Sequence, residues 1–227
     1  MFWIDYWYFI FVLPPLILAI WASYNVKSTY KKYSKVTSFS GMTGRDSAER
    51  ILRENGITNV GIECIQGELT DHFDPKTNVI RLSQGVYHGN SVAALGVAAH
   101  EAGHAVQYAQ NYLPMKIRGS ILPAANIGSS LGIYIAIIGI IFSFKPIAYL
   151  GIILFGFVVL FQLITLPVEF NASSRAIASL EGRLPSGEAD GVKKVLRAAA
   201  LTYVAALLSA IGNLLRLIAL ANGRNRN

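Results

Sequence analysis

The stretch ILPAANIGSSLGIYIAIIGIIFSFKPIAYLGIILFGFVVLFQLITL, residues 121–166, decides the fold. It holds two apolar blocks, 121–144 and 147–166, which are separated by Lys145-Pro146. A helix of about 20 apolar residues crosses a bilayer, so each block predicts a transmembrane helix. The connection is short, and the two helices are therefore expected to form an antiparallel hairpin over residues 121–167. A GxxxG step at Gly128 and Gly132 indicates close helix packing, although such steps also arise by chance.

The composition agrees with a membrane protein. Hydrophobic residues make up 53% of the 227 residues and charged residues only 15%, against about 25% charged residues in average soluble domains. The net charge is +7, but the basic residues gather beside apolar blocks, as at Lys27, Lys31, Lys32 and Lys35. That placement indicates attraction to anionic lipid rather than nucleic-acid binding. The single cysteine, Cys64, excludes an internal disulfide and is expected to be a small buried residue of a strand.

A third apolar block at residues 1–24 predicts an N-terminal transmembrane anchor. Aromatic residues crowd both of its ends, as in the interfacial belts of spanning helices: Trp3, Tyr6, Trp7, Tyr8, Trp21 and Tyr24. Pro14 and Pro15 are expected to kink this helix. Asp5 lies near the start and no Lys or Arg precedes Lys27, so the segment does not resemble a signal peptide.

The last apolar block lies within residues 196–227 and contains Arg216. A central arginine in a span costs about 2.5–3.5 kcal/mol, so Arg216 is expected near an interface, where its side chain can snorkel. The alternative is a helix that lies along the membrane or packs on the protein. A fourth span is the preferred interpretation.

The distribution of basic residues predicts the orientation. Residues 25–120 hold eleven Lys or Arg and residues 168–197 hold five, whereas the hairpin tip has only Lys145. The positive-inside rule therefore places both basic segments in the cytoplasm and the N-terminus outside. Arg224 and Arg226 fit this arrangement poorly.

The polar region 25–120 predicts a small cytoplasmic domain. Thr43 and Asp46 begin a helix in a capping-box pattern, and Gly56 ends it. Strands are expected at 60–65 and 79–83, with the intervening DHFDPKTN (71–78) as a turn. The second strand either pairs with an extended peptide or is an ordinary sheet strand.

A long Ala-rich helix follows, capped by Asn90 or Ser91 and ending before Pro114. It contains His100-Glu101-Ala102-Gly103-His104, the HExxH pattern. Residues four apart share a helical face, so both imidazoles can bind one metal ion while Glu101 faces a water molecule. Three ionisable groups among apolar residues are costly unless they are paired or bind metal. The pattern predicts a catalytic zinc site.

Catalytic zinc takes a third protein ligand. The metzincin pattern is absent, because Gln107 and Gln110 stand where it needs glycine and histidine. Asp190 lies in a polar loop and is expected in the first turn of the next helix. Glu169 follows the third span, after Pro167, which either starts a new helix or kinks the old one. Glu169 is either the third ligand or an interfacial glutamate paired with Arg175.

The chain resembles the neutral zinc metallopeptidase family of bacterial membrane proteins, the YugP-like proteins. The segments that carry the resemblance are AAHEAGHAVQ at 98–107, PVEFNASSRA at 167–176 and DHFDP at 71–75. The resemblance covers nearly the whole chain and implies a membrane zinc metallopeptidase with Glu169 as third ligand. The segment of Glu169 is also distantly similar to that of HtpX-type membrane gluzincins. Those proteases carry an aspartate where this chain has Ser173, so Asn171, Ser173 or Arg175 is expected to support the metal ligands.

Together these features predict an α+β, mainly helical membrane protein, with about four transmembrane helices and a small zincin-like helix and strand domain. The domain is expected on the cytoplasmic face, with residues 168–195 forming a helix that carries the third ligand. One zinc ion would activate water, with Glu101 as general base. Four residues are candidates to stabilise the oxyanion. They are His72, His88, Tyr108 and Arg175, the two histidines being more typical of surface positions.

The expected partners are a protein or peptide substrate, which includes membrane proteins, and the lipid bilayer. Two alternatives remain open from the sequence. One is a site-2-type protease with its active site inside the bilayer, which the polar residues around 43–90 disfavour. The other is a zinc-stabilised membrane adaptor without turnover. Glu101 disfavours this alternative, because a structural zinc site needs no general base.

Overall fold

The computed structural model describes residues 5–223, so the expectations for Trp3, Arg224 and Arg226 lie outside the described residues. The chain is mainly helical with a small strand-containing part, as expected, and its strands form one three-stranded sheet. It divides into two compact units. The helical unit comprises residues up to 23, 116–166 and those from 201 onward, and the mixed unit comprises residues 24–115 and 167–200.

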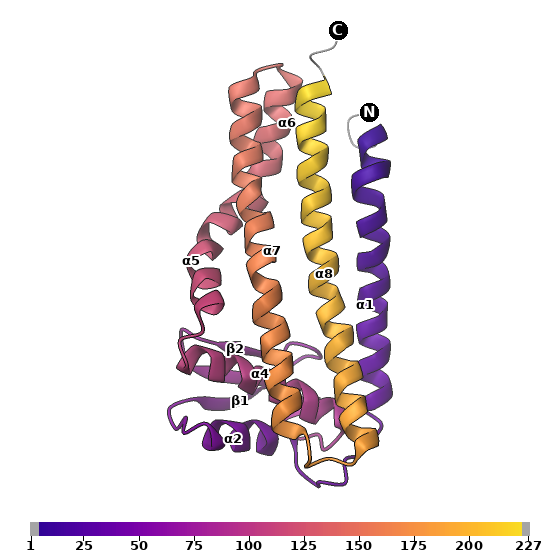
Figure 1. Ribbon diagram of the computed structural model, residues 1–227, viewed down its shortest axis with the longest axis vertical. Helices are drawn as coiled ribbons and strands as arrows, with labels where there is room; N and C mark the ends of the chain where they lie inside the picture. The colour runs from indigo at the N-terminus through magenta and orange to yellow at the C-terminus, as the bar shows by residue number, and fades with distance from the viewer. Residues whose placement is uncertain (1–4, 224–227) are drawn as a thin grey trace. The chain divides into compact units, whose positions relative to one another are not determined.

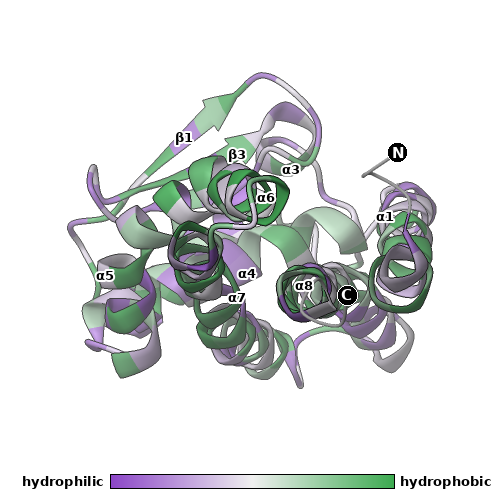
Figure 2. Ribbon diagram, turned by 90° about the horizontal axis from the view of Figure 1, so that it is seen from above, coloured by the Kyte–Doolittle hydropathy of each residue, from purple (hydrophilic) through white to green (hydrophobic). Residues whose placement is uncertain are grey.

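Four helical segments are long and apolar enough to cross a membrane, as the sequence predicts. Their hydrophobic residues are visible in Figure 2 along α1, α6, α7 and α8. The segments are Tyr8–Tyr33 (η1 Tyr8–Val12 and α1 Leu13–Tyr33), Leu113–Ile141 (α5 Leu113–Ile127, η2 Gly128–Gly132 and α6 Ile133–Ile141), Lys145–Leu180 (α7) and Ser186–Gly223 (α8).

Three prolines were expected to kink or end these helices, but each lies within a continuous helix. Pro14 and Pro15 lie in the first turn of α1, directly after the π-helical turn η1. Pro167 lies inside α7, so no new helix starts there and Glu169 belongs to the same helix as the third apolar block. One proline removes one backbone hydrogen bond. Helix α7 continues through Pro167, and Val168 and Ala172 after it are fully buried.

In the helical unit, α6 and α7 form the expected antiparallel hairpin, shown in Figure 1. Their backbones touch at glycines. A Cβ on Gly139 would lie 2.2 Å from the amide nitrogen of Ala148, and one on Gly128 would lie 2.1 Å from the carbonyl oxygen of Leu154. The GxxxG step therefore does mark a close helix approach.

Arg216 has a specific partner that the sequence did not indicate. Its guanidinium donates to Oδ2 of Asp5 at 2.6 and 2.9 Å and lies over the ring of Tyr8 at 5.5 Å. Arg216 is only 8% exposed, so this pair compensates the burial of its charge. The pair joins the start of the first helical segment to the end of α8.

In the mixed unit, helix α2 (Gly44–Glu54) has a complete capping box. Thr43 Oγ1 accepts from the amide of Asp46 at 3.2 Å, and the Asp46 carboxylate accepts from the amide of Thr43 at 2.9 Å. Gly56 follows the helix with φ of 69°, a conformation that suits glycine. Both sequence signals are confirmed.

The sheet has the order β1-β3-β2, with β1 (Gly61–Ile65) parallel and β2 (His72–Asp74) antiparallel to β3 (Val79–Ser83). Two expectations were wrong. DHFDPKTN contains strand β2 as well as a turn, and Cys64, on the edge strand β1, is exposed rather than buried. Since β3 is central, both of its edges are paired and it has no free edge for a peptide.

Helix α3 (Gln84–Tyr87) leads to α4 (Val92–Ala109), the Ala-rich helix. Ser91 is its N-cap, and its side chain accepts from the amide of Ala94 at 3.2 Å. The core of the mixed unit collects apolar residues of α2, the sheet and α4 with those of α7 and α8 that belong to this unit. Helix α4 is thus surrounded by packed side chains, which fixes the direction of the groups it carries.

Candidate metal centre

Helix α4 presents His100 and His104 on one face, with ring centroids 4.7 Å apart. Glu169 reaches them from α7. Its Oε2 lies 3.2 Å from Nε2 of His100 and 3.5 Å from Nε2 of His104. The three ligand atoms lie within 4.8 Å of one another, and they form the one such metal-ligand group among the described residues.

A close helix contact makes this convergence possible. A Cβ on Gly103, between the two histidines, would lie 2.8 Å from the carbonyl oxygen of Ala172 on α7. Only glycine allows the two backbones to come so near. Ala172 lies one turn after Glu169, so the contact holds the glutamate opposite the imidazoles.

The three groups are nearly removed from solvent. The side chains of His100, His104 and Glu169 are 12%, 11% and 3% exposed. Burial alone lowers the pKa of His104, but its hydrogen bond to Glu169 and the charge of Glu101 outweigh burial and raise that pKa above the ordinary histidine value.

Gln107, which stands where the metzincin pattern needs a glycine, belongs to this centre. It is fully buried and its Oε1 lies 3.0 Å from Nδ1 of His104. Its Nε2 donates to the carbonyl of Val168 at 2.8 Å and to Oδ1 of Asn171 at 3.0 Å. The sequence feature that could have indicated this role is the position of Gln107, a polar residue three positions after His104 in an otherwise apolar part of the helix.

The three residues expected to support the ligands divide into two roles. Oγ of Ser173 lies 3.2 Å from Nδ1 of His100 and contacts a candidate ligand directly. Asn171 contacts Gln107, and Arg175 donates to Asn171 at 2.7 Å and to Gln110 at 2.8 Å.

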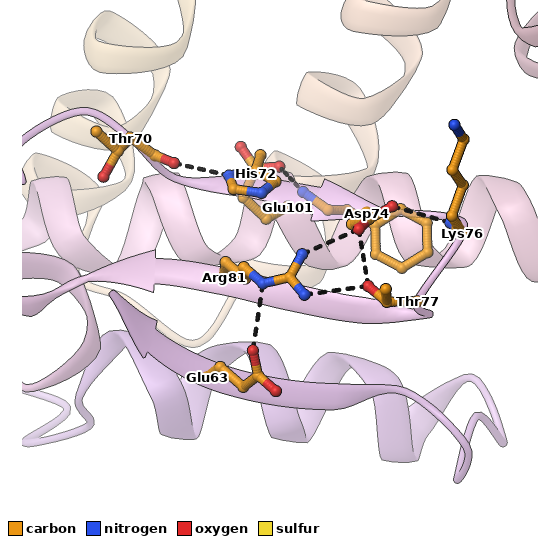
Figure 3. A network of polar contacts seen from close by, with 9 residues as sticks. Glu63, Thr70, His72, Asp74, Lys76, Thr77, Arg81 and Glu101 are labelled. Carbon is orange, nitrogen blue, oxygen red and sulfur yellow. Dashed lines mark hydrogen bonds and ion pairs between the residues drawn. The ribbon is translucent and has the colours of Figure 1, made fainter. Parts of the chain in front are cut away.

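Glu101 lies beside the two imidazoles in sequence but makes a different contact. Its Oε2 accepts a hydrogen bond from the backbone amide of Phe73 on β2 at 3.0 Å, and the residue is 8% exposed. Figure 3 shows this contact where the strand passes the helix. The strand that the sequence missed is therefore the element that orients the candidate base.

Asp71, just before β2, is a second carboxyl group near Glu101. Burial raises the pKa of Asp71, hydrogen bonds from the amide and hydroxyl of Ser83 oppose this, and the charge of Glu101 adds to the rise. Asp71 thereby ties the start of β2 to the end of β3.

A polar network holds β2 on its other side, as Figure 3 shows. Arg81 on β3 donates to Asp74 at 3.0 Å and to Glu63 on β1 at 3.2 Å. Hydrogen bonds from Thr77, the amide of Lys76 and Arg81 hold the pKa of the Asp74 carboxyl well below its usual range. The network fixes all three strands across one face of the sheet.

The structure does not bring the four candidate oxyanion donors together. His72 is exposed, with Nδ1 2.8 Å from the carbonyl of Thr70, and His88 is exposed against the ring of Tyr87. Arg175 is engaged by Asn171 and Gln110. Tyr108 is 48% exposed on α4, one turn after His104.

The donor set fits zinc. Two imidazole nitrogens and one carboxylate oxygen are ligands of a type that catalytic zinc takes, leaving a coordination position open. The hydrogen bond of His104 Nδ1 to Gln107 leaves Nε2 to face Glu169.

The fold and the centre thus define a class: a protein with four apolar helices of membrane-spanning length and a buried two-histidine, one-glutamate site that could hold a metal ion. The family described as "Putative neutral zinc metallopeptidase" matches residues 8–222, and the chain belongs to this family. The chain is also 48% identical over 223 residues to "Putative membrane protease YugP" of Bacillus subtilis (strain 168), covering 96% of this chain and 99% of that protein. No solved structure matches the chain.

Proposed function

We propose that this protein is a membrane-embedded zinc metallopeptidase. His100, His104 and Glu169 hold one zinc ion, and Glu101 is the general base. The observation that carries the proposal is the convergence of three buried ligand atoms within 4.8 Å, with Glu101 held beside them by β2. The family and the name of the Bacillus subtilis relative support the same activity class.

Each residue has a separate part in peptide-bond hydrolysis. Zinc bound there would supply a Lewis acid that polarises the scissile carbonyl and acidifies water. Glu101 takes a proton from the attacking water and passes it to the leaving amine, which needs its carboxylate oriented and close. The amide of Phe73 provides that orientation, because it binds Oε2 and leaves Oε1 to face the water.

Tyr108 is the best placed of the four oxyanion candidates. It lies two turns after Glu101 on α4, and its ring is 5.8 Å from that of Phe73. Its hydroxyl can donate a hydrogen bond to a developing negative charge. In this proposal His72 and His88 are surface residues and Arg175 acts through Asn171.

We propose further that the mixed unit lies on the cytoplasmic side and that the substrates are membrane or misfolded proteins. The excess of Lys and Arg in its segments supports this orientation. The pairing of Asp5 with Arg216 supports four crossings, because an even number returns the two ends to the same side.

The test compares wild type with Glu101→Gln, both purified in detergent, by zinc content and by hydrolysis of fluorescently labelled casein. We expect Glu101→Gln to retain zinc and to lose activity by a factor of about 10² or more. Glu49→Gln, at an exposed position of α2, is the matched control and retains both. Unchanged hydrolysis in Glu101→Gln would contradict its role as base. A wild type that binds zinc but cleaves nothing would favour the adaptor alternative.

A further inference from the structure

We infer that Gln107 is a positioning residue that fixes the tautomer and direction of His104, and that Asn171 and Arg175 act on the metal centre through it. The inference rests on the proposed zinc site. It concerns residues that make no contact with the metal position themselves.

The orientation of the Gln107 amide follows from its neighbours. The carbonyl of Val168, 2.8 Å away, can only accept a hydrogen bond, so the Gln107 atom that faces it must be the amide nitrogen. The oxygen of Gln107 therefore faces Nδ1 of His104 at 3.0 Å. An amide oxygen only accepts, so Nδ1 of His104 must carry the proton.

The consequence reaches the metal position. A neutral imidazole with its proton on Nδ1 has its lone pair on Nε2. That nitrogen of His104 is the one that faces Glu169, at 3.5 Å. Gln107 thus holds His104 ready to bind a cation before any cation arrives, and fixes the plane of its ring.

Asn171 and Arg175 keep Gln107 from turning. Oδ1 of Asn171 accepts from Nε2 of Gln107 at 3.0 Å and from Nε of Arg175 at 2.7 Å. Arg175 carries no acceptor, so its donation fixes the oxygen of Asn171, which in turn fixes the nitrogen of Gln107. Each hydrogen bond in the chain Arg175–Asn171–Gln107–His104 therefore has only one possible donor and one possible acceptor.

The burial of Gln107 makes the arrangement stiff. Gln107 is 0% exposed, so no water competes for its amide. Rotation of the amide by 180° would place its oxygen against the carbonyl of Val168 and its nitrogen against the protonated Nδ1. Both contacts would be repulsive and buried polar groups would be left unpaired, which is costly.

The experiment measures zinc affinity by competition with a chelator, together with the tautomer of His104 by ¹⁵N NMR of histidine-labelled, zinc-free protein at a pH where the His104 ring is neutral. Gln107→Met keeps the length of the side chain but removes its hydrogen bonds. We expect it to bind zinc about 10–100-fold more weakly than wild type and to lose the single Nδ1-protonated tautomer of His104. Gln84→Met, at an exposed position of α3, is the control and changes the affinity less than about threefold, below the range expected of ligand-supporting groups.

The outcomes separate the inference from the proposed function. If wild type binds no zinc, the proposed metal site fails. If wild type binds zinc and Gln107→Met binds it equally well with the same tautomer, only the inference fails. Should Gln107→Met not fold, Asn171→Leu at a half-buried position decides: its unchanged affinity and tautomer would overturn the inference, and a weaker affinity with mixed tautomers would support it.

Discussion

At the scale of single residues, the centre depends on how near α4 and α7 come at Gly103. We expect Gly103→Ala to destabilise the protein by about 1–3 kcal/mol, because its Cβ would meet the backbone carbonyl of Ala172, which cannot rotate away. The helices must separate there, so zinc binding weakens as well. Thermal unfolding in detergent and chelator competition measure the two effects.

Gly187→Ala is the matched control for that substitution. Gly187 lies in the first turn of α8, and a Cβ there meets no heavy atom within 4 Å. It should leave both the unfolding temperature and zinc binding close to wild type. A Gly103→Ala protein as stable as Gly187→Ala, with full zinc affinity, would refute the role assigned to this contact.

Some site residues could be read from local sequence and others could not. The spacing of His100 and His104 determines that they share a helix face, so their proximity followed from the sequence alone. The role of Gln107 was missed because its hydrogen-bond acceptors, Val168 and Asn171, lie about 60 residues away in the sequence, on α7. Only the packing of α7 against α4 shows why the side chain of Gln107 is held in hydrogen-bonding contact with His104.

At the scale of elements, the capping box of α2 gives a pH-dependent prediction. Hydrogen bonds from the hydroxyl and amide of Thr43 lower the pKa of Asp46. A carboxyl with a lowered pKa stabilises the folded state above its unfolded pKa, about 3.9, and this contribution disappears as the pH falls through the folded pKa. Thr43→Ala should therefore cost about 1 kcal/mol near pH 7 and less below about pH 3.

Thermal unfolding of wild type and Thr43→Ala across pH measures this difference directly. Thr58→Ala, at an exposed loop position, serves as the control and should follow wild type at every pH. A loss of stability in Thr43→Ala that was constant from pH 7 to pH 3 would show that the hydroxyl acts without Asp46.

The errors at the element scale came from tertiary context. The helices and strands with strong local signals, such as α2, β3 and α4, formed where the sequence predicted them. Strand β2 has only three residues within a turn-rich segment, and it forms because β3 and Glu101 satisfy its backbone. Cys64 was expected in the core because it is a small apolar residue within a strand pattern, but whether other elements cover that part of a sheet is not a local property.

At the scale of the whole molecule, the first described residue of the chain contacts the last part of α8 in the helical unit. Asp5 and Arg216 form a largely buried ion pair, with Tyr8 against the guanidinium. The sequence indicated that the charge of Arg216 is costly in an apolar helix. It did not indicate that Asp5, more than 200 positions away, compensates this charge. The pairing requires α1 and α8 to run antiparallel within that unit.

The orientation in the membrane can be tested with the one native cysteine, because Cys64 is exposed in the mixed unit. In intact cells, a membrane-impermeant maleimide should label Cys64 only after permeabilisation, as a cytoplasmic position requires. The control is Ser143→Cys in a Cys64→Ser background, at the exposed tip of the α6–α7 hairpin, which should label in intact cells. Labelling of Cys64 in intact cells would reverse the proposed topology.

The central claim is that two imidazoles of α4 and a carboxylate of α7 bind one zinc ion together. The most direct test is the zinc content of purified wild type and Glu169→Ala after dialysis against a weak chelator. Wild type should retain one zinc per chain, whereas Glu169→Ala should lose most of it, because two histidines alone bind the ion more weakly. Equal zinc content in the two proteins, or none in wild type, would contradict the claim.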